Sequence, residues 1–312
     1  MVQGDVMNYN NLDVYFDRYK KIIDEISLKK NYDSNLKHLL YVIMTAFVFK
    51  YDLKCESNII DCFKKTRIIF GETNLNISAF FDRKLLFYNN NYYTDKYILI
   101  GNTISNNYIK YIDTIIHELN HAVNSIKNEV KEDTDKIYLR TGLSYSIYKK
   151  DTNIGIGKTN EYILEEIINT KQTEEIINII LKFSEQSVSD IEISNMLQSI
   201  KREINSDNYR SEAYQYESLI CKDMLNNKTF YVTLEKLRFD GKIDDIIYWF
   251  DNIVGREGSY KELNNLLYVI HNLEIDYSKK KLFKKNILRK IKSNTNRIND
   301  IVTDFNNNCI YK

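Results

Sequence analysis

The amino-acid sequence predicts an α+β fold that is predominantly helical, with a small mixed β-sheet packed on one histidine-bearing helix. The chain has 312 residues, of which 43% are hydrophobic, so it is long enough to bury a large core. It has no proline and only nine glycines, which disfavours a β-sandwich built on many tight turns. Helical periodicity covers most of the chain, whereas short β-branched and aromatic runs gather in a single region.

The first part of the chain, residues 8–51, is predicted to be helical. It contains the most apolar stretch of the sequence, HLLYVIMTAFVF at residues 38–49. About a dozen apolar residues are too few to cross a bilayer, so we expect a buried helix and no membrane span.

The sheet is predicted within residues 67–101. The runs RIIF, NISAFF, LLFY and YILIG are rich in β-branched or aromatic residues, and polar residues or glycine separate them. A helix is expected next, over about residues 106–130. KIYLRTGLSYSIYKK, at 136–150, is either a strand pair or an irregular return segment, and the glycine-rich NIGIGKTN that follows is expected to be a loop.

Helical periodicity resumes at residue 160 and continues to the end of the chain. No segment rich in proline, glycine and serine marks a linker. We therefore divide the chain by its predicted elements into an N-terminal helical region at 1–65, a domain at 66–225 with the sheet and the functional motifs, and a C-terminal helical region at 226–312.

The charge balance argues against a polyanionic partner. There are 44 basic and 43 acidic residues, so we expect neither nucleic acid nor anionic membrane as a partner of the whole molecule. A local exception is SKKKLFKKNILRKIK, at residues 278–292, with apolar residues at helical spacing. It is either a basic patch for an anionic surface or an amphipathic helix with a solvated basic face, and the nearby acidic residues favour the second.

The cysteines indicate a reducing compartment. None of Cys55, Cys62, Cys221 and Cys309 forms a C-x-x-C pair, and their spacing does not suggest a disulfide framework. The first residues lack a basic segment followed by an apolar run, so no signal peptide is expected. These features favour a cytoplasmic protein, with leaderless export or delivery as an effector left open.

Two of the four histidines lie one helical turn apart in YIDTIIHELNHAVNSI, at residues 111–126. On a helix the apolar residues of this segment form one stripe, whereas His117 and His121 project together from the opposite side. Histidines that belong to an apolar core are expected on or beside such a stripe. The pattern therefore favours a metal site over an accident of a buried helix.

The spacing has a chemical reason. Residues i and i+4 of a helix can both direct a ring nitrogen at one ion about 2 Å away. Glu118 is rotated away from this pair, so it is suited to act as a general base on a water held by the ion rather than as a ligand. A catalytic zinc ion needs a third protein ligand and an open fourth position.

The third ligand is sought in GIGKTNEYILEEIINT, at residues 155–170. Asn160 is suited to cap the helix that follows. On that helix Glu161 and Glu165 share the face opposite the apolar residues, and Glu166 lies between the two faces. Either Glu161 or Glu165 can therefore approach the histidines, with the other as a hydrogen-bond partner of a ligand histidine.

His117-Glu118-x-x-His121 followed by Asn160-Glu161-x-x-x-Glu165 resembles the zincin metallopeptidases of the gluzincin type. The resemblance covers about residues 67–170, and it implies a zincin-like catalytic domain. It implies that His117, His121 and Glu161 bind Zn²⁺, that Glu118 is the general base, and that Glu165 and Asn160 lie in the outer shell.

The resemblance also implies that the strand KYILIG, at residues 96–101, is a sheet edge that pairs with an extended peptide. The GKTNE junction resembles that of bacterial toxin proteases of the same clan. Some of those enzymes place the ligand at another register of the helix, so Glu165 stays open as the third ligand.

The function predicted from these features is zinc-dependent hydrolysis of peptide bonds in a peptide or protein substrate. The alternative is a non-catalytic helical binding or effector protein with a structural or degenerate metal site. A group that stabilises the oxyanion is also needed, and the candidates are Arg140, Tyr145, Tyr148, Tyr214, Tyr216 and His271. The sequence does not determine the substrate, endo- or exopeptidase action, or the oligomeric state.

Overall fold

The computed structural model describes residues 12–72, 79–88, 91–101, 108–152, 154–159, 161–204, 209–211, 214–279 and 284–309. Backbone contacts divide the chain into two compact units. The first unit comprises Met1–Leu86, Tyr93–Val123 and Lys171–Ser211, and the second comprises Phe87–Tyr92, Asn124–Thr170 and Glu212–Lys312. The expected boundaries at residues 65/66 and 225/226 do not coincide with the ends of these units. Secondary structure is predominantly helical with two small sheets, which confirms the predicted fold class.

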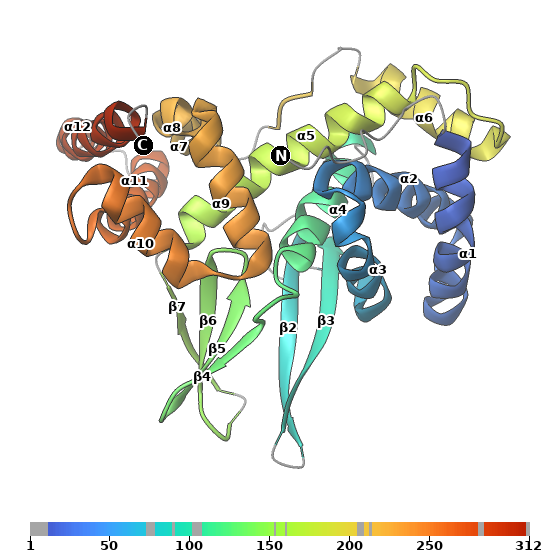
Figure 1. Ribbon diagram of the computed structural model, residues 1–312, viewed down its shortest axis with the longest axis horizontal. Helices are drawn as coiled ribbons and strands as arrows, with labels where there is room; N and C mark the ends of the chain where they lie inside the picture. The colour runs from blue at the N-terminus through green and yellow to red at the C-terminus, as the bar shows by residue number, and fades with distance from the viewer. Residues whose placement is uncertain are drawn as a thin grey trace. The chain divides into compact units, whose positions relative to one another are not determined.

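The first unit begins with three helices and a short 3₁₀ turn (Figure 1). They are α1 (Leu12–Lys30), α2 (Ser34–Tyr51), η2 (Leu53–Cys55) and α3 (Glu56–Lys65). Asp33 caps α2, because its side chain accepts a hydrogen bond from the backbone N–H of Leu36 at 2.8 Å. Every residue of α2 from His38 to Val48 is buried, as the apolar stretch predicts. Within the described residues, no helix is long and apolar enough to cross a membrane.

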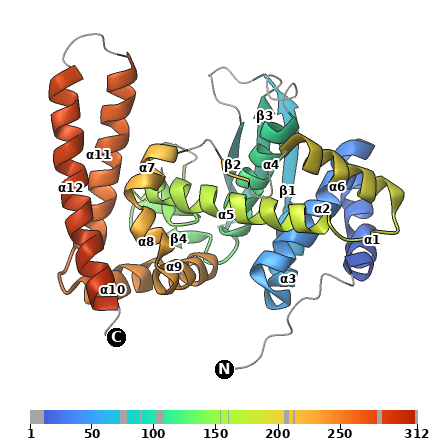
Figure 2. The ribbon, with the colours of Figure 1, turned by 90° about the horizontal axis from the view of Figure 1, so that it is seen from above.

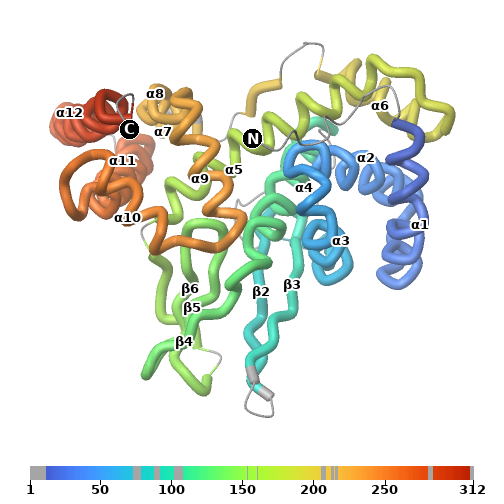
Figure 3. The backbone as a smooth tube through the Cα atoms, in the orientation of Figure 1, coloured from blue at the N-terminus to red at the C-terminus, as the bar shows by residue number. Residues whose placement is uncertain are grey.

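The sheet of the first unit has three strands, β1 (Thr66–Gly71), β2 (Ala79–Tyr88) and β3 (Asn91–Gly101), in the order β1-β3-β2. β1 and β3 are parallel, with Thr66 opposite Lys96 and Gly71 opposite Gly101. Only two residues separate β2 from β3, so these strands can pair only antiparallel, and they run side by side in Figure 3. The sheet is therefore mixed, as expected.

The strand KYILIG does not form a sheet edge. It is the second half of β3, which lies between β1 and β2. The edge expectation is therefore wrong for this strand, because β1 returns to pair beside it in parallel. The strands at the two edges are β1 and β2.

The histidine-bearing helix is α4 (Tyr108–Val123), which ends before the expected limit of residue 130. The following residues form turns, with Asn128 at a positive φ of 50°, and β4 begins at Val130. Helix α6 (Ile191–Ile204) packs on both α2 and α4 within the first unit.

The sheet of the second unit has four antiparallel strands in the order β4-β5-β6-β7. They are β4 (Val130–Glu132), β5 (Lys136–Thr141), β6 (Ser144–Lys149) and β7 (Gly155–Lys158). Gly142 and Leu143 form the two-residue turn between β5 and β6, and Gly142 has a φ of +54°, which glycine adopts without strain. The segment at 136–150 is thus a strand pair. The loop expected at NIGIGKTN instead contains β7, because its backbone pairs with β6.

The helices of the second unit confirm the helical periodicity of the C-terminal half. They are α7 (Gln215–Ile220), α8 (Lys222–Asn226), α9 (Lys228–Asp240), α10 (Ile243–Val254), α11 (Ser259–Lys279) and α12 (Lys284–Cys309). Helices α11 and α12 pack side by side (Figure 2). The core of these helices is aromatic, and Phe230, Phe250 and Phe305 contact one another within it. The basic run at 278–292 contains the end of α11 and the start of α12, and its residues 280–283 lie outside the described residues.

Helix α5 (Tyr162–Phe183) belongs to both units, since Thr170 is counted in the second and Lys171 in the first. It is a single continuous helix of 22 residues. The glutamates of α5 and Glu118 of α4 are the acids considered for the candidate site.

Candidate metal centre

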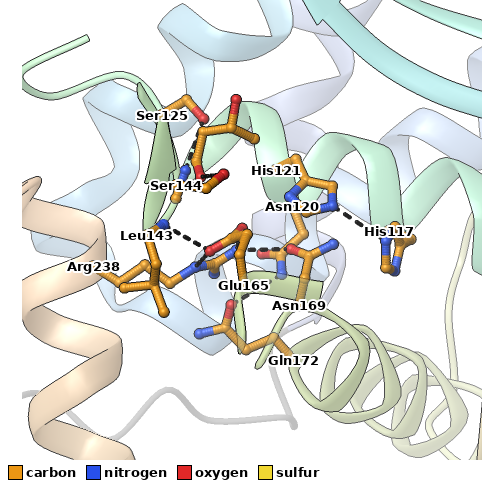
Figure 4. A network of polar contacts seen from close by, with 12 residues as sticks. His117, Asn120, His121, Ser125, Leu143, Ser144, Glu165, Asn169, Gln172 and Arg238 are labelled. Atoms are coloured by element: carbon orange, nitrogen blue, oxygen red, sulfur yellow. Dashed lines mark hydrogen bonds and ion pairs between the residues drawn. The ribbon is translucent and has the colours of Figure 1, made fainter. Parts of the chain in front are cut away.

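Helix α4 brings His117 and His121 together, as their spacing predicts. The two Nε2 atoms are 3.2 Å apart, and the rings meet edge to face with centroids 4.9 Å apart (Figure 4). His121 is buried and His117 is half-buried. The two imidazoles therefore present one nitrogen each to a common point.

The surroundings of α4 differ from the expectation of an apolar face and a polar, accessible face. Asn120 and Asn124 are fully buried although they lie away from the apolar stripe. Asn120 donates from Nδ2 to Oε1 of Gln172 on α5 at 3.0 Å, and it accepts from the hydroxyl of Tyr51 at 2.6 Å. On the side of α4 that carries the histidines, the buried amide of Asn120 is thus satisfied by its contacts with Gln172 and Tyr51.

One group of side chains in the described part of the chain is arranged to hold a metal ion together. It comprises His117, His121 and Glu166, whose ligand atoms all lie within 4.8 Å of one another. Two nitrogens on a tetrahedral zinc ion, each at about 2.0–2.1 Å, are roughly 3.3 Å apart, which matches the distance between the two Nε2 atoms. Two imidazoles and one carboxylate are also the donor set of known catalytic zinc sites. The residues present therefore fit Zn²⁺.

Glu161, the acid expected to be the third ligand, is not a member of this group. It lies in the turn before α5, where its carbonyl oxygen accepts a hydrogen bond from the N–H of Glu165 at 2.9 Å. Its charge contributes to raising the pKa of Tyr260 and of Tyr145, after the larger effect of burial. The group that could hold an ion therefore contains Glu166 and not Glu161. Asn160, expected in the outer shell, lies outside the described residues.

Glu165, the other open candidate, is committed elsewhere. Its carboxylate forms an ion pair with Arg238 of α9, and both side chains are buried (Figure 4). It also accepts a hydrogen bond from the backbone N–H of Leu143 at 2.8 Å, in the turn between β5 and β6. The same guanidinium donates to Oδ1 of Asn169 at 2.9 Å. Both of its carboxylate oxygens are therefore bound by groups of the second unit.

Glu118, the expected general base, lies beside the edge strand of the first unit's sheet. One of its carboxylate oxygens accepts a hydrogen bond from the backbone N–H of Phe81 in β2 at 2.7 Å. Glu118 is only 9% exposed. The carboxylate is therefore held next to the free edge of β2 and one residue from the first histidine.

The structure shows the hydrogen-bond partners of two of the residues considered for stabilising the oxyanion, Arg140 and His271. Arg140 is fully buried, and its guanidinium donates to the carbonyl oxygens of Lys127, Gly142 and Arg238. His271 is paired through Nδ1 with Glu217 at 2.7 Å. The side chain of Tyr216 lies outside the described residues.

The residues that sequence reasoning missed are Glu166 and Arg238. Glu166 was placed between the two faces of its helix, and only the three-dimensional position of its neighbour shows which glutamate is available. The sequence signal for this choice is the adjacent pair of glutamates, Glu165 and Glu166. A glutamate that becomes buried needs a basic partner, which leaves the other glutamate available. That partner, Arg238, lies 73 residues further along the chain, and no local pattern marks it.

Comparison of the chain with models of protein families, with curated proteins and with solved structures finds no match.

Proposed function

We propose that the protein is a zinc-dependent peptidase in which His117, His121 and Glu166 hold the ion and Glu118 is the general base. The observation that supports this most is the convergence of the two imidazoles and the Glu166 carboxylate within 4.8 Å. The adjacent Glu118 supplies a carboxylate that is not needed for ligation. The cytoplasmic location expected from the sequence is part of the proposal.

Zn²⁺ at this position would supply a Lewis acid that polarises the substrate carbonyl and acidifies a water molecule. The residues of the chain would then transfer the protons. Glu118 would accept a proton from the attacking water and pass it to the leaving amine. Its hydrogen bond to the N–H of Phe81 holds the carboxylate in one orientation beside the sheet.

The proposed substrate is an extended peptide or protein segment, and the edge that receives it is β2 rather than KYILIG. In the order β1-β3-β2, the outer side of β2 has no neighbouring strand in this sheet. An extended peptide that pairs with this edge gains main-chain hydrogen bonds. Because β2 also contacts Glu118 through Phe81, such a peptide would run past the proposed base.

The test is hydrolysis of a fluorescently labelled, unfolded casein by the zinc-loaded protein, with and without a chelator. We expect hydrolysis that the chelator abolishes and that added zinc restores. The variant Glu118→Gln should keep its zinc and lose about 10²–10⁴-fold in turnover, the usual contribution of a general acid–base group. The control is Glu25→Gln, which changes an exposed acid on α1 and should leave turnover unchanged.

Two results would contradict the proposal. Full turnover in Glu118→Gln would remove Glu118 from the mechanism. Stoichiometric zinc without hydrolysis of any unfolded substrate would favour the alternative, a binding or effector protein with a structural metal site.

A further inference from the structure

A second candidate site lies wholly within the first unit. It is a cavity of about 670 Å³, within the range of small-molecule binding sites. The start of α2, the end of β1, the first turns of α4 and the first turns of α6 line it. None of the proposed zinc ligands does so.

One wall of the cavity is aromatic. Phe70 of β1 stacks on Tyr111 of α4, with ring centroids 6.2 Å apart and planes 26° apart, and Tyr108 lies one turn before Tyr111. Phe70 is 47% exposed, which is unusual for so large an apolar side chain that packs on a neighbour. Burial raises the pKa of both tyrosines, so their rings stay neutral and keep electron-rich faces at physiological pH.

Two acids also line the cavity, and both are exposed. Asp33 uses one carboxylate oxygen to cap α2, and the described residues give its other oxygen no donor. The charge of Asp33 contributes to the raised pKa of Tyr111, which places the carboxylate near the aromatic wall. Glu192 of α6 is the second acid, and it pairs with Nε2 of His38 at 2.7 Å. Among the described residues that line the cavity there is no lysine or arginine.

Whether the cavity favours a cation or an anion depends on the balance between the helix dipoles and the carboxylates that line it. The N-terminal ends of α2 and α6 each contribute roughly half a positive charge. Asp33 and Glu192 each contribute a full negative charge at the same ends, and together these charges exceed the positive charge of the dipoles. Carboxylate oxygens and aromatic faces together favour an organic cation.

We propose that this cavity binds a small organic cation, a primary ammonium carried on an apolar body. The ammonium lies against the free oxygen of Asp33 and the face of Tyr111, and the apolar body packs on Phe70. This site does not depend on the zinc centre or on peptidase activity.

The test is isothermal titration of the full-length protein at pH 8 with three probes of one shape. Phenethylamine carries the cation, 2-phenylethanol is its neutral counterpart, and phenylacetate is the anion. We expect saturable binding of phenethylamine, with a dissociation constant on the order of 0.1–1 mM for a ligand of this size. The alcohol should bind at least about 10-fold more weakly, and the anion should not saturate.

Two variants test whether phenethylamine binds in this cavity. Asp33→Asn keeps a side chain that caps a helix as well as aspartate does, so the fold is retained while the charge is lost. We expect it to weaken phenethylamine at least about 10-fold and to leave the alcohol unchanged. Phe70→Leu should weaken both. Glu25→Gln, which changes an exposed acid on α1, should alter neither.

Several outcomes would overturn the proposal. Equal affinity for the amine and the alcohol would remove the charge recognition. Tighter binding of phenylacetate would show that the helix ends dominate. Absence of saturable amine binding, or amine binding that Asp33→Asn leaves unchanged, would show that no cation site exists here.

Discussion

The carboxylate of Glu165 lies against the guanidinium of Arg238, and both side chains are almost completely excluded from solvent. The pair ties three elements of the second unit together, because Arg238 is on α9, Glu165 is on α5, and the N–H of Leu143 in the β5–β6 turn donates to the same carboxylate. It also fixes the rotation of the first turns of α5. Since Glu165 is directed at Arg238, the next residue, Glu166, is directed about 100° further round the helix.

Replacement of Arg238 by methionine should destabilise the second unit by about 3–5 kcal/mol, because Glu165 would be left as an uncompensated buried charge. Urea unfolding followed by the fluorescence of Trp249 measures this. The single tryptophan of the chain lies in the second unit, where it packs on Phe230 and Phe305.

The double variant Glu165→Leu, Arg238→Met is the matched control. It removes both charges together, so it should lose less stability than the sum of the single variants. Asp245→Asn, which breaks an exposed contact with Lys242, should cost less than about 1 kcal/mol. A loss below about 1 kcal/mol in Arg238→Met would show that the pair does not stabilise the fold.

The variant Gly142→Ala should destabilise the same unit by at least about 2 kcal/mol. A Cβ atom at Gly142 would overlap the carboxylate of Glu165, and the φ of +54° is strained for alanine. The backbone strain costs roughly 1–2 kcal/mol and the overpacking roughly 1–3 kcal/mol. Gly255→Ala separates these terms, because Gly255 has a φ of +79° and open space around its Cβ. Equal losses in the two variants would refute the predicted close approach to Glu165.

The raised pKa of Glu274 should lower the free energy of unfolding of the protein as the pH rises. Burial raises its pKa to about 7, and the charge of Glu217 adds to this effect. Between about pH 4.5 and pH 7 the unfolded chain releases this proton while the folded chain keeps it, so the folded state loses stability relative to the unfolded state across that interval.

Glu274→Gln removes this proton linkage. The free energy of unfolding of the variant, minus that of the unchanged protein, should be more positive at pH 8 than at pH 4. Glu257→Gln, at an exposed position between α10 and α11, serves as the comparison. The same difference at both pH values would contradict the raised pKa.

The parts of the fold that the sequence predicts well are those with a strong local period. The apolar run of α2 and the apolar stripe of α4 allowed both helices to be placed from the sequence, although burial of the histidine-bearing side of α4 was not expected. The position of β3 at the centre of its sheet could not, because it depends on β1 returning to pair with it in parallel. β7 was expected to be a loop because two glycines weaken its strand pattern, although β6 provides it with backbone partners.

The candidate site was predictable to the same extent. The i, i+4 spacing of His117 and His121 fixes their convergence within one helix, and Glu118 follows from its place between them. Which glutamate of α5 is available depends on Arg238, and that contact is non-local. Sequence reasoning could therefore propose acids of this helix as ligands but could not choose between them.

The central claim is that two imidazoles of α4 and the carboxylate of Glu166 hold one zinc ion. A competition titration with a chromophoric zinc chelator, made on the unchanged protein and on His121→Ala, Glu166→Gln and Glu161→Gln, tests it directly. We expect one zinc per chain, with affinity lost in His121→Ala and reduced by more than about 100-fold in Glu166→Gln, beyond what loss of an outer hydrogen-bond partner causes. Glu161→Gln should stay within about 10-fold of the unchanged protein. Unchanged affinity in His121→Ala and Glu166→Gln, or no zinc bound by the unchanged protein, would contradict the account.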